Sequence, residues 1–149
     1  MFERRSSPTI LIVEDNDDDF EATERALRKN KNLSNPITRC RDGLDAWAYL
    51  RQEGKYAPPN DPPQPGLVLL DLNMPGLCGR KLLSRVKGDP VLCKLPVVVL
   101  TTSAANEDIN GCYRAGANTY IPKPVSWTEF AASIDRLHEY WFQVALLPR

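Results

Sequence analysis

Five short apolar runs recur along the chain, separated by segments of a different periodicity. The runs are rich in β-branched and aliphatic residues without polar alternation, as is typical of strands buried on both faces of a parallel sheet. They predict strands at residues 9–13, 37–40, 67–70, 97–100 and 118–121, of which 37–40 is weaker than the others.

The intervening segments place apolar residues at helical spacing. They predict helices over 17–29, from Gly43, over about 79–86, near 108–114 and from Ser126. Gly116 follows the fourth helix, where glycine commonly ends a helix, and Ser126 with Glu129 forms an S-x-x-E capping box. The stretch 58–65 holds five prolines and is predicted to be a stiff surface loop.

Strands that alternate with helices predict an α/β fold in which helices cover both faces of a five-stranded parallel sheet. The pattern extends over residues 8–142 and fits one domain, as the length of 149 residues also suggests. In such sheets, binding and chemistry take place beyond the carboxyl ends of the strands. The residues that follow each predicted strand are therefore the first candidates for a functional site.

Composition narrows the class of protein. The 19 Lys and Arg residues balance 19 Asp and Glu residues, which argues against direct binding to nucleic acid or to an anionic membrane. No apolar signal segment precedes the first strand, and no run approaches the ~20 apolar residues of a membrane span, so the cytoplasm is the default location. The four cysteines form no C-x-x-C pair and are predicted to be reduced thiols, and the single histidine disfavours a zinc site.

Polar side chains follow four of the five predicted strands. Glu14 and Asp15 follow the first, Asp71 the third, Thr101 the fourth and Lys123 the fifth. Each has an ordinary explanation when taken alone: a helix-start acid, a turn aspartate, a strand-end hydroxyl or a surface lysine. Together, at matching strand ends, they favour one metal-assisted phosphoryl site.

The chemistry of such a site follows from the residue types. Carboxylates held close together raise one another's pKa unless a cation lies between them, and Mg²⁺ prefers their oxygen ligands. A phosphoryl group on Asp71 would need cationic and hydrogen-bonding partners, which Lys123 and the hydroxyl of Thr101 can supply.

These residues resemble the receiver domain of two-component response regulators. The resemblance rests on Glu14-Asp15, on D-L-N-M-P-G from Asp71, on T-T-S from Thr101 and on Y-I-P-K-P-V from Tyr120. It implies a flavodoxin-like (βα)5 doubly wound fold with strand order 2-1-3-4-5. The segments V-E-D-N, L-L-D-L-N-M-P and L-P-V-V-V-L-T-T-S, with the aromatic tail at 140–142, most resemble the small stand-alone receivers paired with bacterial phytochrome histidine kinases.

The resemblance implies a role for each residue of the acidic site. Asp71 would accept a phosphoryl group from a histidine of the sensor kinase. Asp15, Asp71 and the backbone carbonyl of Asn73 would bind Mg²⁺, with Glu14 helping through water, and Lys123 would pair with the phosphoryl group.

It also implies a conformational switch. Thr101 would move to bond the phosphoryl group, Tyr120 would turn inward, and Asn73 and Ser103 would influence how fast water removes the group. The signal would then be read by an unidentified downstream protein from the surface of the fourth helix, fifth strand and fifth helix. That face carries aromatic residues for which core packing is the alternative: Tyr113, Trp127 and Tyr140.

Three further expectations concern assembly and competing functions. The apolar tail at 143–149 is predicted to pack on the domain or in a homodimer. A haloacid-dehalogenase-like phosphohydrolase would need a second acid where Asn73 stands, so catalysis on an outside substrate is not expected. A receiver that is never phosphorylated usually lacks an acid or the lysine, whereas this chain keeps them all.

Overall fold

The computed structural model describes residues 8–29, 35–72, 74, 77–101, 105–123 and 127–140. Within these residues five strands alternate with five α-helices, and two 3₁₀ helices lie between them. The strands are β1 (Ile10–Val13), β2 (Ile37–Cys40), β3 (Leu67–Leu70), β4 (Val97–Thr101) and β5 (Thr119–Pro122). The helices are α1 (Asp17–Arg28), α2 (Gly43–Arg51), η1 (Gly54–Tyr56), α3 (Gly79–Gly88), η2 (Leu92–Lys94), α4 (Asn106–Arg114) and α5 (Trp127–His138).

The strands form one parallel sheet in the order β2-β1-β3-β4-β5, as predicted. β3 lies at its centre, with Val13 of β1 opposite Leu70 and Val99 of β4 also opposite Leu70. Three neighbouring strands therefore end close together at the carboxyl edge, which fixes where the residues after them lie.

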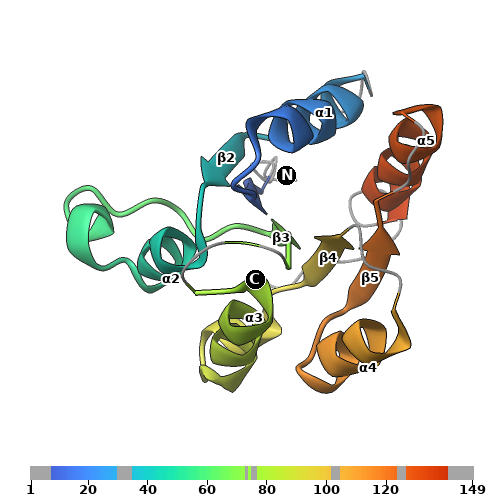
Figure 1. Cartoon of the computed structure of the whole chain (residues 1–149). Helices are drawn as coiled ribbons and strands as arrows, with labels where there is room; N and C mark the ends of the chain where they lie inside the picture. Colours follow the sequence, from blue (N-terminus) through green and yellow to red (C-terminus); the bar gives the residue numbers. More distant parts are fainter. Residues whose placement is uncertain are drawn as a thin grey trace, which may run out of the picture.

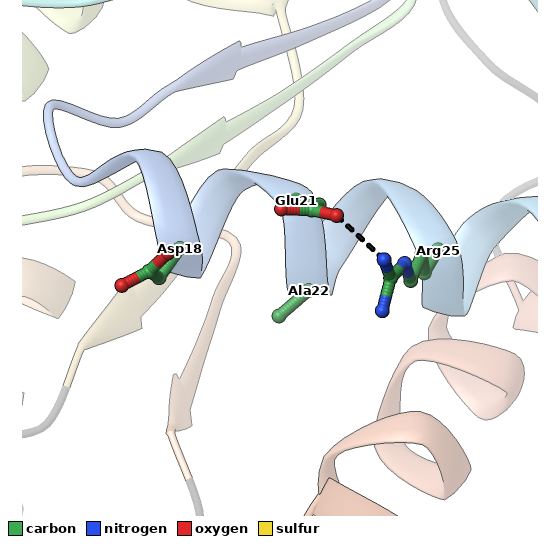
Figure 2. Close-up of a pocket in the computed structure, with 4 residues that line it drawn as sticks. All are labelled: Asp18, Glu21, Ala22 and Arg25. Carbon is green, nitrogen blue, oxygen red and sulfur yellow. Dashed lines mark hydrogen bonds and ion pairs between the residues drawn. The ribbon is translucent and has the colours of Figure 1, made fainter.

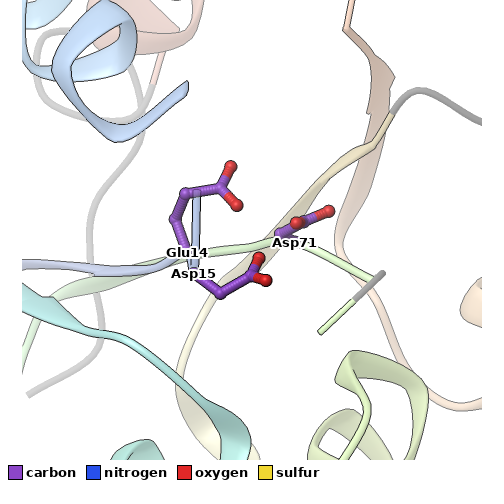
Figure 3. Close-up of side chains that lie close together, drawn as sticks. All are labelled: Glu14, Asp15 and Asp71. Atoms are coloured by element: carbon purple, nitrogen blue, oxygen red, sulfur yellow. The ribbon is translucent and has the colours of Figure 1, made fainter. Parts of the chain in front are cut away.

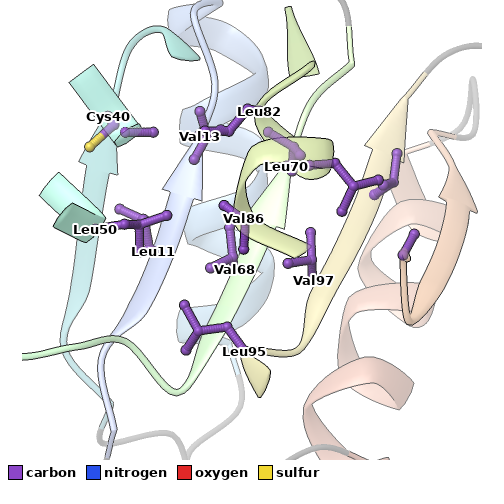
Figure 4. Packing of buried hydrophobic residues seen from close by; sticks show 14 of the residues in the cluster. Leu11, Val13, Cys40, Leu50, Val68, Leu70, Leu82, Val86, Leu95 and Val97 are labelled. Carbon is purple, nitrogen blue, oxygen red and sulfur yellow. The ribbon is translucent and has the colours of Figure 1, made fainter. Parts of the chain in front are cut away.

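Helices cover both faces of the sheet, with α1 and α5 on one side and α2, α3 and α4 on the other (Figure 1). Alternate residues of each strand point to opposite layers. Leu11, Val13, Val68 and Leu70 belong to the larger core beneath α2 and α3 (Figure 4), whereas their strand neighbours Ile10, Ile12, Leu67 and Leu69 pack on the side of α1 and α5. All eight side chains are buried, which explains why the strands show no polar alternation.

The observed elements agree closely with the sequence prediction, with a few differences. Each strand begins or ends within one residue of its predicted limit, and residues 58–65 form neither strand nor helix. Gly116 has a φ of +103°, the left-handed conformation expected after α4. α4 begins two residues earlier than predicted, and η1 and η2 were not predicted.

Side-chain exposure tests several smaller expectations. All four cysteines are free thiols, and Cys40 and Cys112 are buried. Core packing is wrong for Tyr113 and Tyr140, whose side chains are 49% and 53% exposed. The side chain of Trp127, the cap residue Ser126 and the tail at 143–149 lie outside the described residues. No helix among the described residues is long and apolar enough to span a membrane.

Candidate functional site

The carboxyl ends of β1 and β3 bring the predicted acids together. The backbone N–H of Asp71 donates to the carbonyl of Val13 at 3.0 Å, so the residue after β3 is tied to the end of β1. The N–H of Glu14 donates to the carbonyl of Cys40 at 3.0 Å, which ties the same edge to β2. The strand register and the lengths of the strands thus determine the positions of Glu14, Asp15 and Asp71.

The three acids form a compact cluster, as Figure 3 shows. One carboxylate oxygen from each of Glu14, Asp15 and Asp71 lies within 4.8 Å of the others. Glu14 and Asp71 are only 3% and 8% exposed, while Asp15 is exposed. The cluster is therefore a partly buried group of oxygen donors with one side open to solvent.

Burial and like charge determine the electrostatics of this cluster. Burial and, next, a hydrogen bond with Asp71 raise the pKa of Glu14, Lys123 lowers it, and the net value is about 7. A glutamate that holds its proton near neutral pH beside another carboxylate indicates too little positive charge for the acids present. A divalent cation with a preference for oxygen ligands would supply that charge, so the donor set fits Mg²⁺.

Lys123 reaches the cluster from the end of β5. Its backbone N–H donates to the carbonyl of Thr101, and its ammonium group donates to Glu14 and, at 3.0 Å, to Asp19. The side chain of Lys123 is 10% exposed. Burial alone would lower the pKa of Lys123, but the bond to Glu14 and the nearby acids outweigh it, and the net pKa is raised. The lysine is therefore held as a cation among carboxylates.

The remaining predicted residues are placed less completely. Thr101 ends β4 and is fully buried, and Tyr120 in β5 lies opposite Val99 with only 9% exposure. Asn73 and Ser103 lie outside the described residues. The structure thus brings the acids and Lys123 together and sets Thr101 at the same sheet edge, through the backbone bond to Lys123.

Two residues near the cluster were missed by the sequence analysis. Asp19 lies in the first turn of α1, where its N–H donates to the capping side chain of Asn16 at 2.9 Å. Arg39 of β2 donates to the carbonyl of Glu14 at 3.0 Å and pairs with Asp17 at 2.8 Å. The run of acids at 17–19 is visible in the sequence, but acids are common in the first turn of a helix, where they suit the helix dipole. Nothing in that pattern links Asp19 to a residue 104 positions later.

A separate hollow lies on the surface of α1. It has a volume of about 310 Å³, and its described lining comprises Asp18, Glu21, Ala22 and Arg25, with an ion pair of 2.6 Å between Glu21 and Arg25 (Figure 2). None of these residues belongs to the predicted site. The chemistry is concentrated at the sheet edge.

Comparison with known proteins places the chain in a family. The response regulator receiver domain model matches residues 10–135. Response regulator Rcp1 of Synechocystis sp. is 35% identical over 139 residues, which cover 93% of this chain and 92% of Rcp1.

Two solved structures extend the comparison. The phosphorylated cyanobacterial phytochrome response regulator RcpA matches with a TM-score of 0.90 and 39% identity, over 97% of this chain and 100% of RcpA. The Mn²⁺-bound form of Rcp1 matches with a TM-score of 0.88 and 34% identity, over 95% of this chain and 99% of Rcp1. Because the family model matches most of the chain and Rcp1 matches it over nearly its whole length, the chain belongs to the response regulator receiver domain family.

Proposed function

We propose that this chain is a phosphoacceptor response regulator that receives a phosphoryl group on Asp71 from a histidine of a sensor kinase. The observation that carries the proposal is the convergence of Glu14, Asp15 and Asp71 within 4.8 Å, with the ammonium group of Lys123 bonded to Glu14. A metal-assisted transfer of an anionic group requires this combination of oxygen ligands and a fixed cation.

Asp71 is the acceptor because of its position. It follows the central strand, its backbone is fixed to β1, and one oxygen of its carboxylate lies within 4.8 Å of those of the other acids (Figure 3). In the transfer, an oxygen of Asp71 bonds to phosphorus while the phosphorus–nitrogen bond of the phosphohistidine breaks. The electron pair stays on the imidazole, and Asp71 becomes an acyl phosphate. Later attack by water releases inorganic phosphate and restores the carboxylate.

The carboxylates of Asp15 and Asp71 and the backbone carbonyl of Asn73 would hold Mg²⁺, with Glu14 acting through water. When bound, the ion would offset the charge of the carboxylates and of the incoming phosphoryl group. The part of Asn73, which lies outside the described residues, rests on the family resemblance alone.

The residues around Asp71 respond to the presence of the phosphoryl group. Lys123 pairs with the phosphoryl group as a point charge, and Thr101 moves to donate its hydroxyl. Tyr120 on the adjacent strand then changes its packing, so that the surface of α4, β5 and α5 differs between two states. Asn73 and Ser103 would control the access of water to the acyl phosphate.

The partners follow by analogy. The similar proteins include a cyanobacterial phytochrome response regulator, so we propose a sensor kinase of the phytochrome type.

We also propose a homodimer that involves the tail at 143–149. Sedimentation at tens of micromolar protein, with and without beryllofluoride as a phosphoryl mimic, tests the dimer; a monomer under both conditions rejects it.

Phosphorylation is tested by incubation with Mg²⁺ and acetyl phosphate followed by intact-mass measurement. The native protein should gain one phosphoryl group, Asp71→Asn should gain none, and Asp89→Asn, a buried acid away from the cluster, should label normally. No label on native protein, under conditions that label a control receiver, would reject the phosphoacceptor role. Equal labelling of Asp71→Asn would move the site elsewhere. A phosphotransfer panel of histidine kinases from the same organism would then identify the donor.

A further inference from the structure

The ammonium group of Lys123 is shared between two carboxylates that differ sharply in environment. Glu14 is a buried strand-end acid, with a side chain 4% exposed. Asp19 comes from α1, its side chain is 45% exposed, and its oxygen lies 3.0 Å from the lysine nitrogen. Only Glu14 belongs to the acidic cluster at the sheet edge. Asp19 is thus an additional partner of the lysine, supplied by a helix.

The position of Asp19 is fixed by the fold. Its N–H is held by the cap residue Asn16 at 2.9 Å, and its carbonyl accepts the hydroxyl of Thr23 at 2.9 Å. The first turn of α1 therefore holds this carboxylate at a set distance from the end of β5. The backbone of Asp19 is therefore ordered without the lysine, and only side-chain rotamer freedom is lost when it pairs with Lys123.

From this geometry we propose that Asp19 is a positioning residue that holds Lys123 in the unphosphorylated state and competes with the phosphoryl group for it. The inference rests on the proposed function of Asp71. An acyl phosphate on Asp71 draws the ammonium group toward its oxygens, and the bond to Asp19 weakens as that happens. Because Asp19 stabilises one state only, it shifts the equilibrium away from the phosphorylated arrangement.

We predict that the protein binds a phosphoryl mimic more tightly when the carboxylate charge of Asp19 is removed. With saturating Mg²⁺, Asp19→Asn should bind beryllofluoride about 2–5-fold more tightly than the native protein, the range expected for one partly exposed ion pair. Isothermal titration calorimetry measures this affinity. Thermal unfolding of each variant confirms that it is folded.

Asp18→Asn is the matched control. Asp18 is exposed, lies in the same helical turn and carries the same charge, but it lines the outer hollow of α1 instead of contacting Lys123 (Figure 2). Its substitution reproduces the general loss of negative charge near the site and the change at the helix dipole. It should alter beryllofluoride affinity by less than the Asp19 substitution, with the native value nearly retained.

Two measurements separate a direct effect of Asp19 on Lys123 from the general effect of removing a negative charge near the site. The side-chain ammonium resonance of Lys123, assigned by its loss in Lys123→Met, should shift in Asp19→Asn and stay in place in Asp18→Asn. In the Lys123→Met background, Asp19→Asn should leave beryllofluoride affinity unchanged, because the partner it restrains is gone.

The outcomes distinguish this inference from the proposed function. If native protein does not bind beryllofluoride, the proposed function fails and the inference fails with it. If native protein binds but Asp19→Asn is equal or weaker, the inference alone is overturned. Equal gains in Asp18→Asn and Asp19→Asn, or a gain that persists in Lys123→Met, overturn it as well.

Discussion

Helix α3 begins beside the acidic cluster that contains Glu14 and ends at Asp89, and the pKa values of these two buried acids are shifted in opposite directions. Its first residue, Gly79, donates to the carbonyl of Leu72 at 3.2 Å, directly after the acidic cluster. Its last turn leads to Asp89, which is 8% exposed, close to the 3% of Glu14 in the cluster. The two acids are similarly buried, yet the pKa of Glu14 is raised and that of Asp89 is lowered.

The partners explain the difference. Asp89 accepts hydrogen bonds from the backbone N–H groups of Val91 at 2.8 Å and Leu92 at 3.0 Å, and from Arg51 at 2.6 Å. Its charge is satisfied by donors that the fold itself supplies. Glu14 has no such set of donors in the described part of the chain: burial and then its hydrogen bond with Asp71 raise its pKa, and Lys123 lowers it only in part. The chain's own donors satisfy Asp89, which gives this acid a structural role, whereas Glu14 is set against other acids, an arrangement that a cation from solution would relieve.

The largest expected effect on stability comes from adding a methyl group at Gly79, where α3 begins beside the acidic cluster. A Cβ added at Gly79 would lie 2.3 Å from the carbonyl oxygen of Asp71 and 2.7 Å from the Cα of Leu72. Both neighbours are backbone atoms that cannot rotate away, so Gly79→Ala should destabilise the protein by about 3 kcal/mol. Urea unfolding at pH 7 measures the change.

Gly88→Ala is the matched control at the other end of the same helix. A Cβ there meets no atom within 4 Å, and the substitution should be neutral or stabilising by up to about 1 kcal/mol. If both variants were equally stable, the backbone after Asp71 would not be as closely packed as the structure indicates.

The second prediction concerns magnesium. If the cluster binds the ion in the folded state only, Mg²⁺ at 100 times its dissociation constant should raise the free energy of unfolding by about 2.7 kcal/mol. Asp71→Asn should lose most of this gain. Asp89→Asn should keep it, because Asp89 lies outside the acidic cluster and is bonded to donors of the chain itself. Thermal unfolding with Mg²⁺ and with EDTA gives the comparison. An undiminished gain in Asp71→Asn would place the ion elsewhere.

The sequence predicted the parts of this molecule that depend on local order. β-branched runs such as Ile10–Val13 fixed the strands, and an acid directly after a strand had to lie at the sheet edge, which is why Asp71 and Glu14 could be named in advance. The contact of Asp19 with Lys123 and that of Arg51 with Asp89 could not be predicted. They depend on how far each helix is rotated about its axis and on long side chains that bridge 104 and 38 positions. No periodicity in the sequence encodes those two quantities.

The third prediction is a pH dependence of the metal-free protein. The folded pKa of Glu14, about 7, lies above the unfolded value of 4.5, so the folded state binds more protons between these limits. Its stability should therefore fall as pH rises through that window, by roughly 1–2 kcal/mol. Glu14→Gln should remove this fall. Unfolding free energies at pH 5 and pH 7.5 in EDTA, compared between the two proteins, isolate the contribution of Glu14. An identical pH profile in Glu14→Gln would show that Glu14 is ionised throughout.

The smallest effect is expected at Asp89, and its pH dependence has the opposite sign. Backbone hydrogen bonds from Leu92 and Val91, with the Arg51 ion pair, lower its pKa below 3.8, so its stabilisation is complete above that value and is lost as pH falls through the folded pKa. Asp89→Asn keeps a side-chain oxygen for both N–H groups and should lower the melting temperature at pH 7 only slightly, while Asp89→Ala should lower it more. Near pH 3 the gap between native protein and Asp89→Asn should narrow. Equal melting temperatures for the Asn and Ala variants at pH 7 would mean that the charge pair with Arg51, rather than the backbone donors, makes this acid a structural one.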